Sequence, residues 1–172
     1  MNEIEKALEK ATDTKACVIG AGATESAAKM FGDLFPETRK AVVVSDPRTR
    51  KVAGARVVDL LKASGVEVAE HVICPDGVWF HAEYKWIDEV RAAIAAVPGA
   101  VPVAVGSGTI NDTVKRSSEE LGLRYMVVGT AASMDGYTSY GASITKDGIK
   151  QTMPCKAPLG CIVDSAVAAA AP

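Results

Sequence analysis

No stretch of this 172-residue sequence approaches the run of about 20 apolar residues that a membrane-spanning helix needs. An excess of charge of either sign is also missing. The formal net charge is −2, so composition gives no reason to expect nucleic acid or an anionic membrane surface as a partner. Residues 1–6 are charged and contain no apolar secretory segment, which argues against a signal peptide. We therefore expect a cytoplasmic protein without a membrane span.

Closely spaced metal-binding or disulfide-forming residues are absent as well. The sequence has four cysteines, far apart and without a CxxC pair: Cys17, Cys74, Cys155 and Cys161. This spacing argues against a disulfide scaffold or a zinc knuckle and is typical of reduced thiols. The two histidines, His71 and His81, have no HxxxH spacing and no carboxylate at ligand spacing. We expect this chain to bind no metal by itself.

Apolar residues, by contrast, are plentiful. They make up 48% of the sequence, which is enough for a substantial core, and the length predicts a single domain over residues 1–172. Near-continuous apolar runs predict buried parallel strands at residues 15–20, 41–45, 66–73, 101–105, 124–128 and 159–163. Between them, helices are expected at residues 3–11, 24–31, 52–63, 84–96 and 109–121.

Alternation of strands with helices of this length indicates right-handed βαβ crossovers. The predicted fold is therefore a Rossmann-like α/β fold, an open and mostly parallel sheet with helices on both faces. The pattern changes near the C-terminus, where the pair Asp147-Gly148 separates two strand-like runs, residues 142–146 and 149–153. An Asp-Gly pair in that position predicts a β-hairpin.

Polar residues follow several of these strands, at the edge where ligands of such sheets bind. Asp46 comes directly after the second strand, where its carboxylate could accept hydrogen bonds from the ribose of an adenosine group. The alternative interpretation is structural, because an Asp before Pro47 is a good helix N-cap. The residues alone leave both roles open.

Residues 103–115 predict a strand that turns sharply into a helix through Gly106-Ser107-Gly108. Backbone N–H groups and the positive end of the helix dipole would face a ligand there, and glycines let a phosphate approach closely. Asp112, one turn into the helix, could meet a ribose, and Lys115 lies a turn further on. The alternative is an ordinary turn with a solvated Asp and Lys. The glycine turn at residues 20–25 is a weaker candidate, since Glu25 replaces the last glycine of GxGxxG.

The segment at residues 130–139 places many hydroxyl groups around one carboxylate, Asp135. That composition suits a polyol or a phosphate, and the alternative is a flexible polar connection to the hairpin.

Three segments resemble the sn-glycerol-1-phosphate dehydrogenase branch of the iron-containing alcohol dehydrogenase, glycerol dehydrogenase and dehydroquinate synthase superfamily. Residues 106–115 resemble the family's GGGxxxDxxK-type loop, and residues 130–139 closely resemble its TAPSMDGYTS-type segment. Residues 156–164 resemble the strand that follows the family's hairpin.

This resemblance implies NAD or NADP as the cofactor, with Arg48 able to accommodate a 2′-phosphate. It implies that Asp46 binds the adenosine ribose. The implied pyrophosphate contacts are Gly106, Ser107, Gly108 and Thr109. Asp112, Thr130 and Ser133 would lie along the nicotinamide half. Asp135 would be the catalytic residue beside a phosphorylated polyol or ketone substrate, with Ser139 nearby and Lys146 as a weaker substrate contact.

In that family the divalent metal, of the zinc or iron type, is held by a helical C-terminal domain that begins about where this chain ends. The resemblance therefore implies the cofactor half of a dehydrogenase, inactive alone and dependent on a helical partner domain. The alternative is a stand-alone module that binds a nucleotide or a phosphorylated metabolite without catalysis. We also expect a homo-oligomer that associates through the hairpin or the C-terminal strand, because the missing domain would leave apolar surface exposed.

Overall fold

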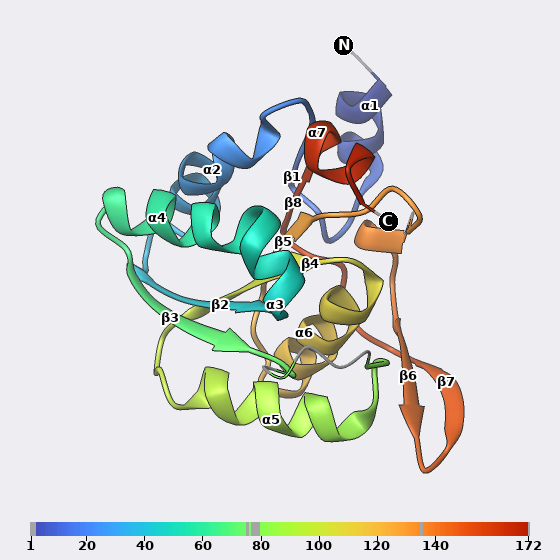
Figure 1. Ribbon diagram of the computed structural model, residues 1–172. Helices are drawn as coiled ribbons and strands as arrows, with labels where there is room; N and C mark the ends of the chain where they lie inside the picture. Colours follow the sequence, from blue (N-terminus) through green and yellow to red (C-terminus); the bar gives the residue numbers. More distant parts are fainter. Residues whose placement is uncertain (1–2, 75, 77–79, 135, 172) are drawn as a thin grey trace.

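The computed structural model describes residues 3–74, 76, 80–134 and 136–171 (Figure 1). Six strands form one sheet in the order β1-β8-β5-β4-β2-β3, and every neighbouring pair is parallel. The strands are β1 (Ala16–Gly20), β2 (Lys40–Ser45), β3 (Glu67–Val72), β4 (Val101–Gly106), β5 (Met126–Gly129) and β8 (Gly160–Asp164). This arrangement confirms the predicted Rossmann-like sheet.

Helices cover both faces of this sheet (Figure 1). The longer ones are α2 (Ala27–Leu34), α4 (Ala55–Ala63), α5 (Tyr84–Ala95) and α6 (Gly108–Glu120). The shorter ones are α1 (Glu3–Lys10), α3 (Pro47–Thr49) and α7 (Ser165–Ala169), with 3₁₀ turns at Ala23–Ser26 and Gly136–Thr138. A π-helical turn, Arg50–Gly54, joins α3 to α4. The helix predicted over residues 52–63 thus begins earlier, where Asp46 caps α3.

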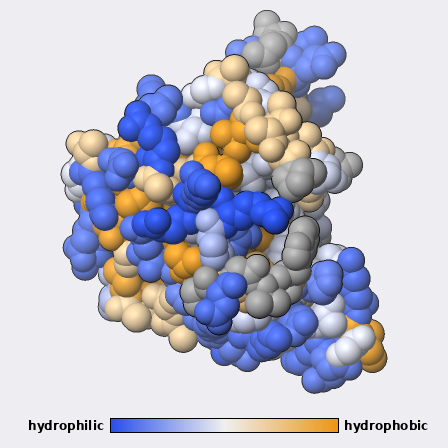
Figure 2. Space-filling view, in the orientation of Figure 1, coloured by the Kyte–Doolittle hydropathy of each residue, from blue (hydrophilic) through white to orange (hydrophobic). Residues whose placement is uncertain are grey.

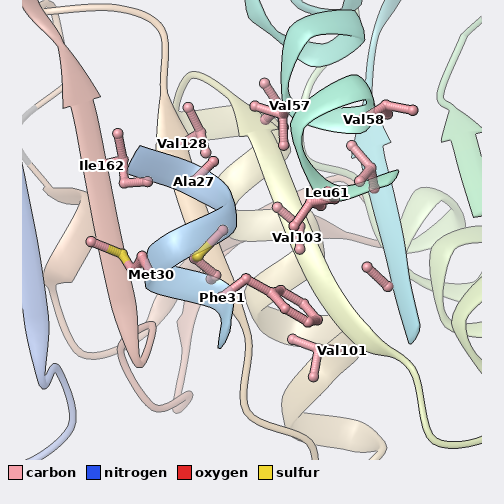
Figure 3. Close-up of a cluster of buried hydrophobic side chains, with 14 of the residues drawn as sticks. Ala27, Met30, Phe31, Val57, Val58, Leu61, Val101, Val103, Val128 and Ile162 are labelled. Atoms are coloured by element: carbon pink, nitrogen blue, oxygen red, sulfur yellow. The ribbon is translucent and has the colours of Figure 1, made fainter. Parts of the chain in front are cut away.

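Alternate residues of the central strands supply two separate cores. All six residues of β4 are buried, because both of its faces are covered. Val103 packs with Phe31 of α2 and Leu61 of α4 in one core, which Figure 3 shows. Ala104, the next residue, belongs to the opposite core with Val90 of α5. The continuous apolar runs of the sequence therefore correspond to strands between two helical layers.

The predicted hairpin is present with the predicted bounds, β6 (Ala142–Lys146) and β7 (Ile149–Met153). Asp147 and Gly148 at its turn have φ of +52° and +76°, the left-handed conformation that a tight hairpin turn requires. The hairpin extends away from the main sheet (Figure 1). It is anchored by the Thr145 amide, which donates to the carbonyl oxygen of Ala82 at 2.7 Å, and by Ile144, which is fully buried.

The C-terminal strand β8 lies inside the sheet, between β1 and β5. The expectation of self-association through that strand is therefore wrong, because both of its edges are already paired. The edge strand on that side is β1, where Val18 and Ile19 are 38% and 55% exposed. Across the described ranges, no helix is both long and apolar enough to span a membrane.

Candidate functional site

All six strands of the main sheet end at one edge, because they run parallel. Asp46 follows β2, Ser107 follows β4 and Thr130 follows β5. Gly106 lies opposite Gly129 in the register, so the turn after β4 and the loop after β5 leave the sheet side by side. The fold thus gathers these predicted cofactor residues at the edge where doubly wound sheets bind ligands.

The turn after β4 leads directly into α6. Ser107 is its N-cap, and the Ser107 side chain makes no capping hydrogen bond to a described residue. The amide of Asn111 donates to the carbonyl oxygen of Ser107 at 3.0 Å, so helical bonding begins there. The N–H groups before Asn111 have no partner within the helix and carry the positive end of its dipole. The predicted anion site would use these N–H groups, and phosphate binding there stays a prediction.

Both glycines of this turn are also required by packing within the protein. A Cβ on Gly106 would lie 2.6 Å from the Cβ of Ile110, and one on Gly108 would lie 3.0 Å from the Cγ of Met134. A core forced to accept such contacts must shift. Glycine at these positions was predicted to let a phosphate approach the backbone closely. The lack of a Cβ also lets Ile110 of α6 and Met134 pack against the turn.

The loop at residues 130–139 is held at several points. Thr130 is buried, and its amide donates to the carbonyl oxygen of Gly106 at 3.2 Å. The Tyr137 hydroxyl donates to the carbonyl oxygen of Ala131 at 3.0 Å and accepts from the Ala131 amide at 3.2 Å. The first part of the loop is therefore fixed relative to β4 by hydrogen bonds, unlike a purely flexible connection.

Two predicted residues, Ser133 and Ser139, belong to the outer part of this loop. Ser133 and Ser139 are exposed, and the Ser139 hydroxyl donates to the carbonyl oxygen of Gly136 at 2.8 Å. Asp135, the predicted catalytic residue, lies outside the described residues. The substrate and cofactor roles of these side chains stay predictions.

Lys115, on α6, is the most unusual charged residue near the site, because its side chain is 0% exposed. Its ammonium group donates to the carbonyl oxygens of Ser139 and Gly141, each at 3.0 Å. Burial lowers the pKa of Lys115, against the opposing effect of Asp112, whose Oδ1 lies 3.8 Å from Nζ. The interpretation of a solvated lysine is therefore wrong. Lys115 attaches the end of the loop and the start of the hairpin to α6.

Asp112 lies between the helix and the hairpin. Its Oδ2 accepts a hydrogen bond from the Ser143 amide at 3.1 Å. Burial raises the pKa of Asp112, although the Ser143 bond and the charges of Lys115 and Lys150 oppose the increase. The carboxylate is thus partly buried and partly used to position the hairpin, rather than fully solvated.

A hollow of about 440 Å³ opens between the first turns of α6 and the hairpin. Its lining residues are His81, Ala82, Gly108, Thr109, Asp112, Ser143, Thr145 and Lys150. Gly108, Thr109 and Asp112 were predicted from the sequence, and the other five were missed. The signal for Ser143 and Thr145 is the two-residue period of a strand, which places them on one face of β6. The hairpin surface visible in Figure 2 is mostly hydrophilic.

Lys146, the predicted weaker substrate contact, does not line this hollow. Its Nζ lies 4.1 Å from the ring centre of Tyr84 on α5, a cation–π contact. Successive residues of a strand point to opposite faces, so Lys146 and Thr145 differ in direction. The hairpin lysine that lines the hollow is instead Lys150, the register partner of Thr145.

Asp46 caps α3. The Thr49 amide donates to its Oδ1 at 2.7 Å, and the Asp46 amide donates to the Thr49 hydroxyl at 3.0 Å, which is a reciprocal capping box. The alternative interpretation as a helix cap is confirmed. Ribose binding by Asp46 stays a prediction.

The second glycine turn, at residues 20–25, is occupied by a carboxylate of the protein itself. Asp164 accepts hydrogen bonds from the amides of Gly22, Thr24 and Ala166, at 3.1, 3.2 and 3.1 Å. Burial raises the pKa of Asp164, but these hydrogen bonds outweigh burial and hold it below its ordinary value. The amides that would bind a phosphate at this turn therefore already have an anionic partner.

Within the part of the chain that the structure describes, no group of three or more His, Cys, Asp or Glu side chains is arranged to hold a metal ion. His71 instead lies 2.9 Å from Glu89, Nε2 to Oε1, and His81 lines the hollow.

Comparisons with known proteins identify the family and agree with the fold. A family model described as iron-containing alcohol dehydrogenase matches residues 18–172. A glycerol-1-phosphate dehydrogenase [NAD(P)+] of Halalkalibacterium halodurans is 34% identical over 123 residues, covering 71% of this chain and 31% of that protein. The enzyme of the same name from Methanothermobacter thermautotrophicus is 33% identical over 153 residues, covering 89% of this chain and 42% of that protein.

Solved structures show the same fold. Glycerol dehydrogenase from Schizosaccharomyces pombe superposes with a TM-score of 0.78 at 25% identity, covering 94% of this chain and 40% of that one. An archaeal alcohol dehydrogenase from a Red Sea brine pool gives a TM-score of 0.80 at 18% identity, covering 93% of this chain and 46% of that one. The chain thus spans about a third to under half the length of these proteins. It belongs to the iron-containing alcohol dehydrogenase family, on the glycerol-1-phosphate dehydrogenase branch that its motifs resemble.

Proposed function

We propose that this chain forms the nucleotide-binding domain, over residues 1–172, of a metal-dependent, NAD(P)-linked polyol-phosphate dehydrogenase. The proposed reaction interconverts dihydroxyacetone phosphate and sn-glycerol 1-phosphate. The observation that carries the proposal is the hollow beside the start of α6, next to the hydroxyl-rich loop at residues 130–139. The names of the curated relatives support the same activity, but the chain covers only 31–42% of their length.

The residues at this edge of the sheet suit a dinucleotide. The pyrophosphate would lie on the turn from Gly106 to Thr109, where helix amides and the Thr109 hydroxyl supply donors. The nicotinamide half would follow Asp112, Thr130 and Ser133. When bound, NAD(P)H supplies the hydride, and the residues of this chain hold and orient it.

The adenosine ribose would bind at Asp46, at the end of the neighbouring strand β2. Its cap bond uses Oδ1, and the ribose hydroxyls would donate to this carboxylate. A carboxylate favours NAD over NADP, because it repels a 2′-phosphate. The choice between the two cofactors is therefore part of the test below.

The substrate would lie between the cofactor and the loop at residues 130–139, with Ser139 and the predicted catalytic Asp135 beside it. The divalent metal that polarises the substrate carbonyl would be held by a helical partner domain, as the family resemblance implies. We therefore expect this polypeptide alone to bind cofactor without turnover. The four free cysteines suit a cytoplasmic protein. Two exposed apolar side chains, Ile19 on β1 at 55% and Ile149 on the hairpin at 68%, lie on the surfaces through which we expect a homo-oligomer to form.

Asp46→Asn tests the cofactor site. Asparagine caps a helix as well as aspartate does, so the fold should keep its stability. The charge that attracts the ribose hydroxyls is lost, so calorimetry should show NADH affinity reduced about tenfold, the equivalent of one charged hydrogen bond. NADPH affinity should fall less, because the repulsion of the 2′-phosphate is also removed.

Wild-type protein that binds neither NADH nor NADPH would contradict the proposal. The enzymatic part is tested by adding the helical region of a relative in trans and following NAD(P)H oxidation with dihydroxyacetone phosphate. Cofactor binding without any rate above that of the helical region alone would favour a stand-alone binding module instead.

A further inference from the structure

Two of the four cysteines, far apart in the sequence, are neighbours in the main sheet. Cys17 is on β1 and Cys161 is on β8, and they are direct register partners in this parallel pair of strands. Neighbouring strands lie about 4.7–4.9 Å apart, and the Cα atoms of disulfide-bonded residues lie roughly 4.4–6.8 Å apart. Both side chains also point to the same face, because both contact the core that contains Val90 and Ala104. The backbone therefore holds the two thiols side by side, at a spacing that a disulfide can bridge.

The two thiols differ in their access to solvent. Cys161 is only 2% exposed, whereas Cys17 is partly exposed. Ile19 points to the same face of the edge strand as Cys17, because side chains alternate along a strand, and it is 55% exposed. A small solute can therefore approach the sulfur of Cys17 from this face, while the core protects Cys161.

The two thiols also differ in acidity. The hydrogen bond from the Cys161 thiol lowers the pKa of Cys17 to about 7, although burial opposes the decrease. The same hydrogen bond and burial raise the pKa of Cys161. Burial raises the pKa of Cys74 and of Cys155 as well. Because the thiolate is the nucleophile, Cys17 is the most reactive of the four cysteines at neutral pH, and a second thiol lies beside it.

We propose that Cys17 and Cys161 form a reversible oxidation site, at which a peroxide converts the two thiols into a disulfide that links β1 to β8. The Cys17 thiolate attacks one oxygen of hydrogen peroxide, the O–O bond breaks, and the departing hydroxide takes up a proton to leave as water. Cys17 is then a sulfenic acid. The Cys161 thiol attacks this sulfur, the S–S bond forms, and the thiol proton leaves with the hydroxyl group as a second water. The two sulfurs lose two electrons in total, and the peroxide gains them.

The location of the pair determines what this disulfide changes. It lies near the start of both strands, whereas the predicted cofactor residues follow the carboxyl ends, so the inference does not depend on cofactor binding. β1 is the edge strand, paired with β8 in the sheet, and the disulfide adds a covalent link to that pairing. The link closes a loop over most of the chain, which stabilises a fold by restricting the unfolded state. Disulfides of cytoplasmic proteins are typically transient or redox-sensing, which agrees with a reversible site.

The first test uses the wild-type chain. After treatment with hydrogen peroxide at neutral pH, mass spectrometry of the digested protein should show two peptides joined through Cys17 and Cys161. The joined pair should be two hydrogens lighter than the separate peptides, and dithiothreitol should separate it. In the untreated protein, limiting iodoacetamide should alkylate Cys17 about fivefold faster than Cys74, which is also partly exposed but has a raised pKa.

Three variants separate the roles of the two thiols. Cys161→Ser keeps a hydrogen-bond donor but has no sulfur, so Cys17 should stay reactive and stop at a sulfenic acid that dimedone traps. Cys161→Ala also removes the donor, so alkylation of Cys17 should slow about fivefold. Cys74→Ser is the matched control and should form the Cys17–Cys161 link as the wild-type protein does. Circular dichroism checks that all three variants fold.

Several results would overturn the proposal. They are wild-type protein in which peroxide joins no Cys17 and Cys161 peptides, a disulfide to Cys74 or Cys155 instead, and alkylation of Cys17 no faster than that of Cys74. Equal dimedone trapping at Cys17 in the wild type and in Cys161→Ser would also reject it, because Cys161 would then not react with the oxidised sulfur. NADH binding is measured on the reduced protein, so the proposed function stands or fails independently of this site.

Discussion

Lys115→Met removes the buried charge that connects α6 to the loop and the hairpin. Methionine keeps an unbranched side chain of similar length, so the packing of the stem is largely preserved. Two carbonyl oxygens, of Ser139 and Gly141, lose the ammonium that donates to them at 3.0 Å. Asp112 loses its cation at 3.8 Å. The substitution therefore isolates the electrostatic contribution of this lysine.

Two opposing effects determine how much Lys115→Met lowers the free energy of unfolding. Each hydrogen bond to a charged group contributes about 1.5–3 kcal/mol, so the two together are worth about 3–6 kcal/mol. Burying the ammonium has a cost, which is why the pKa of Lys115 is lowered, and methionine recovers part of that cost. We expect a net loss of about 2–4 kcal/mol in the free energy of unfolding. For a chain of this length that corresponds to a decrease in Tm of roughly 5–15 °C.

Urea unfolding followed by circular dichroism measures the decrease in the free energy of unfolding. Hydrogen exchange identifies the segments that are destabilised. Exchange should accelerate at residues 139–146, whose position depends on Lys115, before it does in β4. Lys29→Met is the control, since Lys29 is 80% exposed and pairs with Asp33, four residues away on the same helix. Its effect should stay within about 0.5 kcal/mol.

A double variant separates the two consequences of the substitution. Asp112→Asn in the Lys115→Met background removes the carboxylate that was left without its cation but keeps an oxygen to accept the Ser143 amide. The double variant should be more stable than Lys115→Met alone, because the uncompensated charge is gone. Stability of Lys115→Met equal to that of the Lys29 control would refute this account of the buried lysine.

Two further predictions concern the same edge of the sheet. Because hydrogen bonds hold the pKa of Asp164 below its ordinary value of 3.8, its carboxylate stabilises the fold above that pH and the contribution disappears as pH falls through the lowered pKa. Asp164→Asn should therefore lower the urea midpoint at pH 7 and approach wild type in strong acid; a constant difference at all pH values would contradict this. Gly106→Ala should lower the free energy of unfolding by about 1–3 kcal/mol, because the new Cβ would lie 2.6 Å from Ile110. Gly32→Ala in α2 is the control and should be neutral or stabilising, because nothing lies within 4 Å of its Cβ position. Similar urea midpoints for the two variants would argue against the packing role of Gly106.

The local elements were predictable because each depends on neighbouring residues. Buried parallel strands need apolar side chains on both faces, which is why the run at residues 101–105 identifies β4. The hairpin was predicted with correct bounds, because Asp147-Gly148 is one of the few pairs that adopt its left-handed turn. The boundaries that shifted, such as the start of the helix predicted at residue 52, moved because a side-chain cap at Asp46 extended the helical region.

The order of strands was not predictable in the same way. β8 is the last strand in sequence and lies between β1 and β5, which are far apart in the chain. No local pattern encodes which strands become neighbours, since all of them are apolar and of similar length. The sequence therefore did not show that β8, named as a route of self-association, has both of its edges paired.

The residues of the candidate site also fall into two groups, those that the sequence predicts and those that only tertiary contacts bring together. From the sequence alone came Asp46, the turn from Gly106 to Thr109, and the loop at residues 130–139, because strands of a parallel sheet end at one edge whatever their order. Tertiary structure alone decided which charges meet there. It buried Lys115 instead of exposing it, directed Lys146 toward Tyr84, and placed Lys150 and His81 on the wall of the hollow. The physical reason is that these positions depend on how the hairpin packs against α6 and the start of α5. Those contacts join segments far apart in the sequence, such as Lys115 and Ser139 or Thr145 and Ala82, and no local period records them.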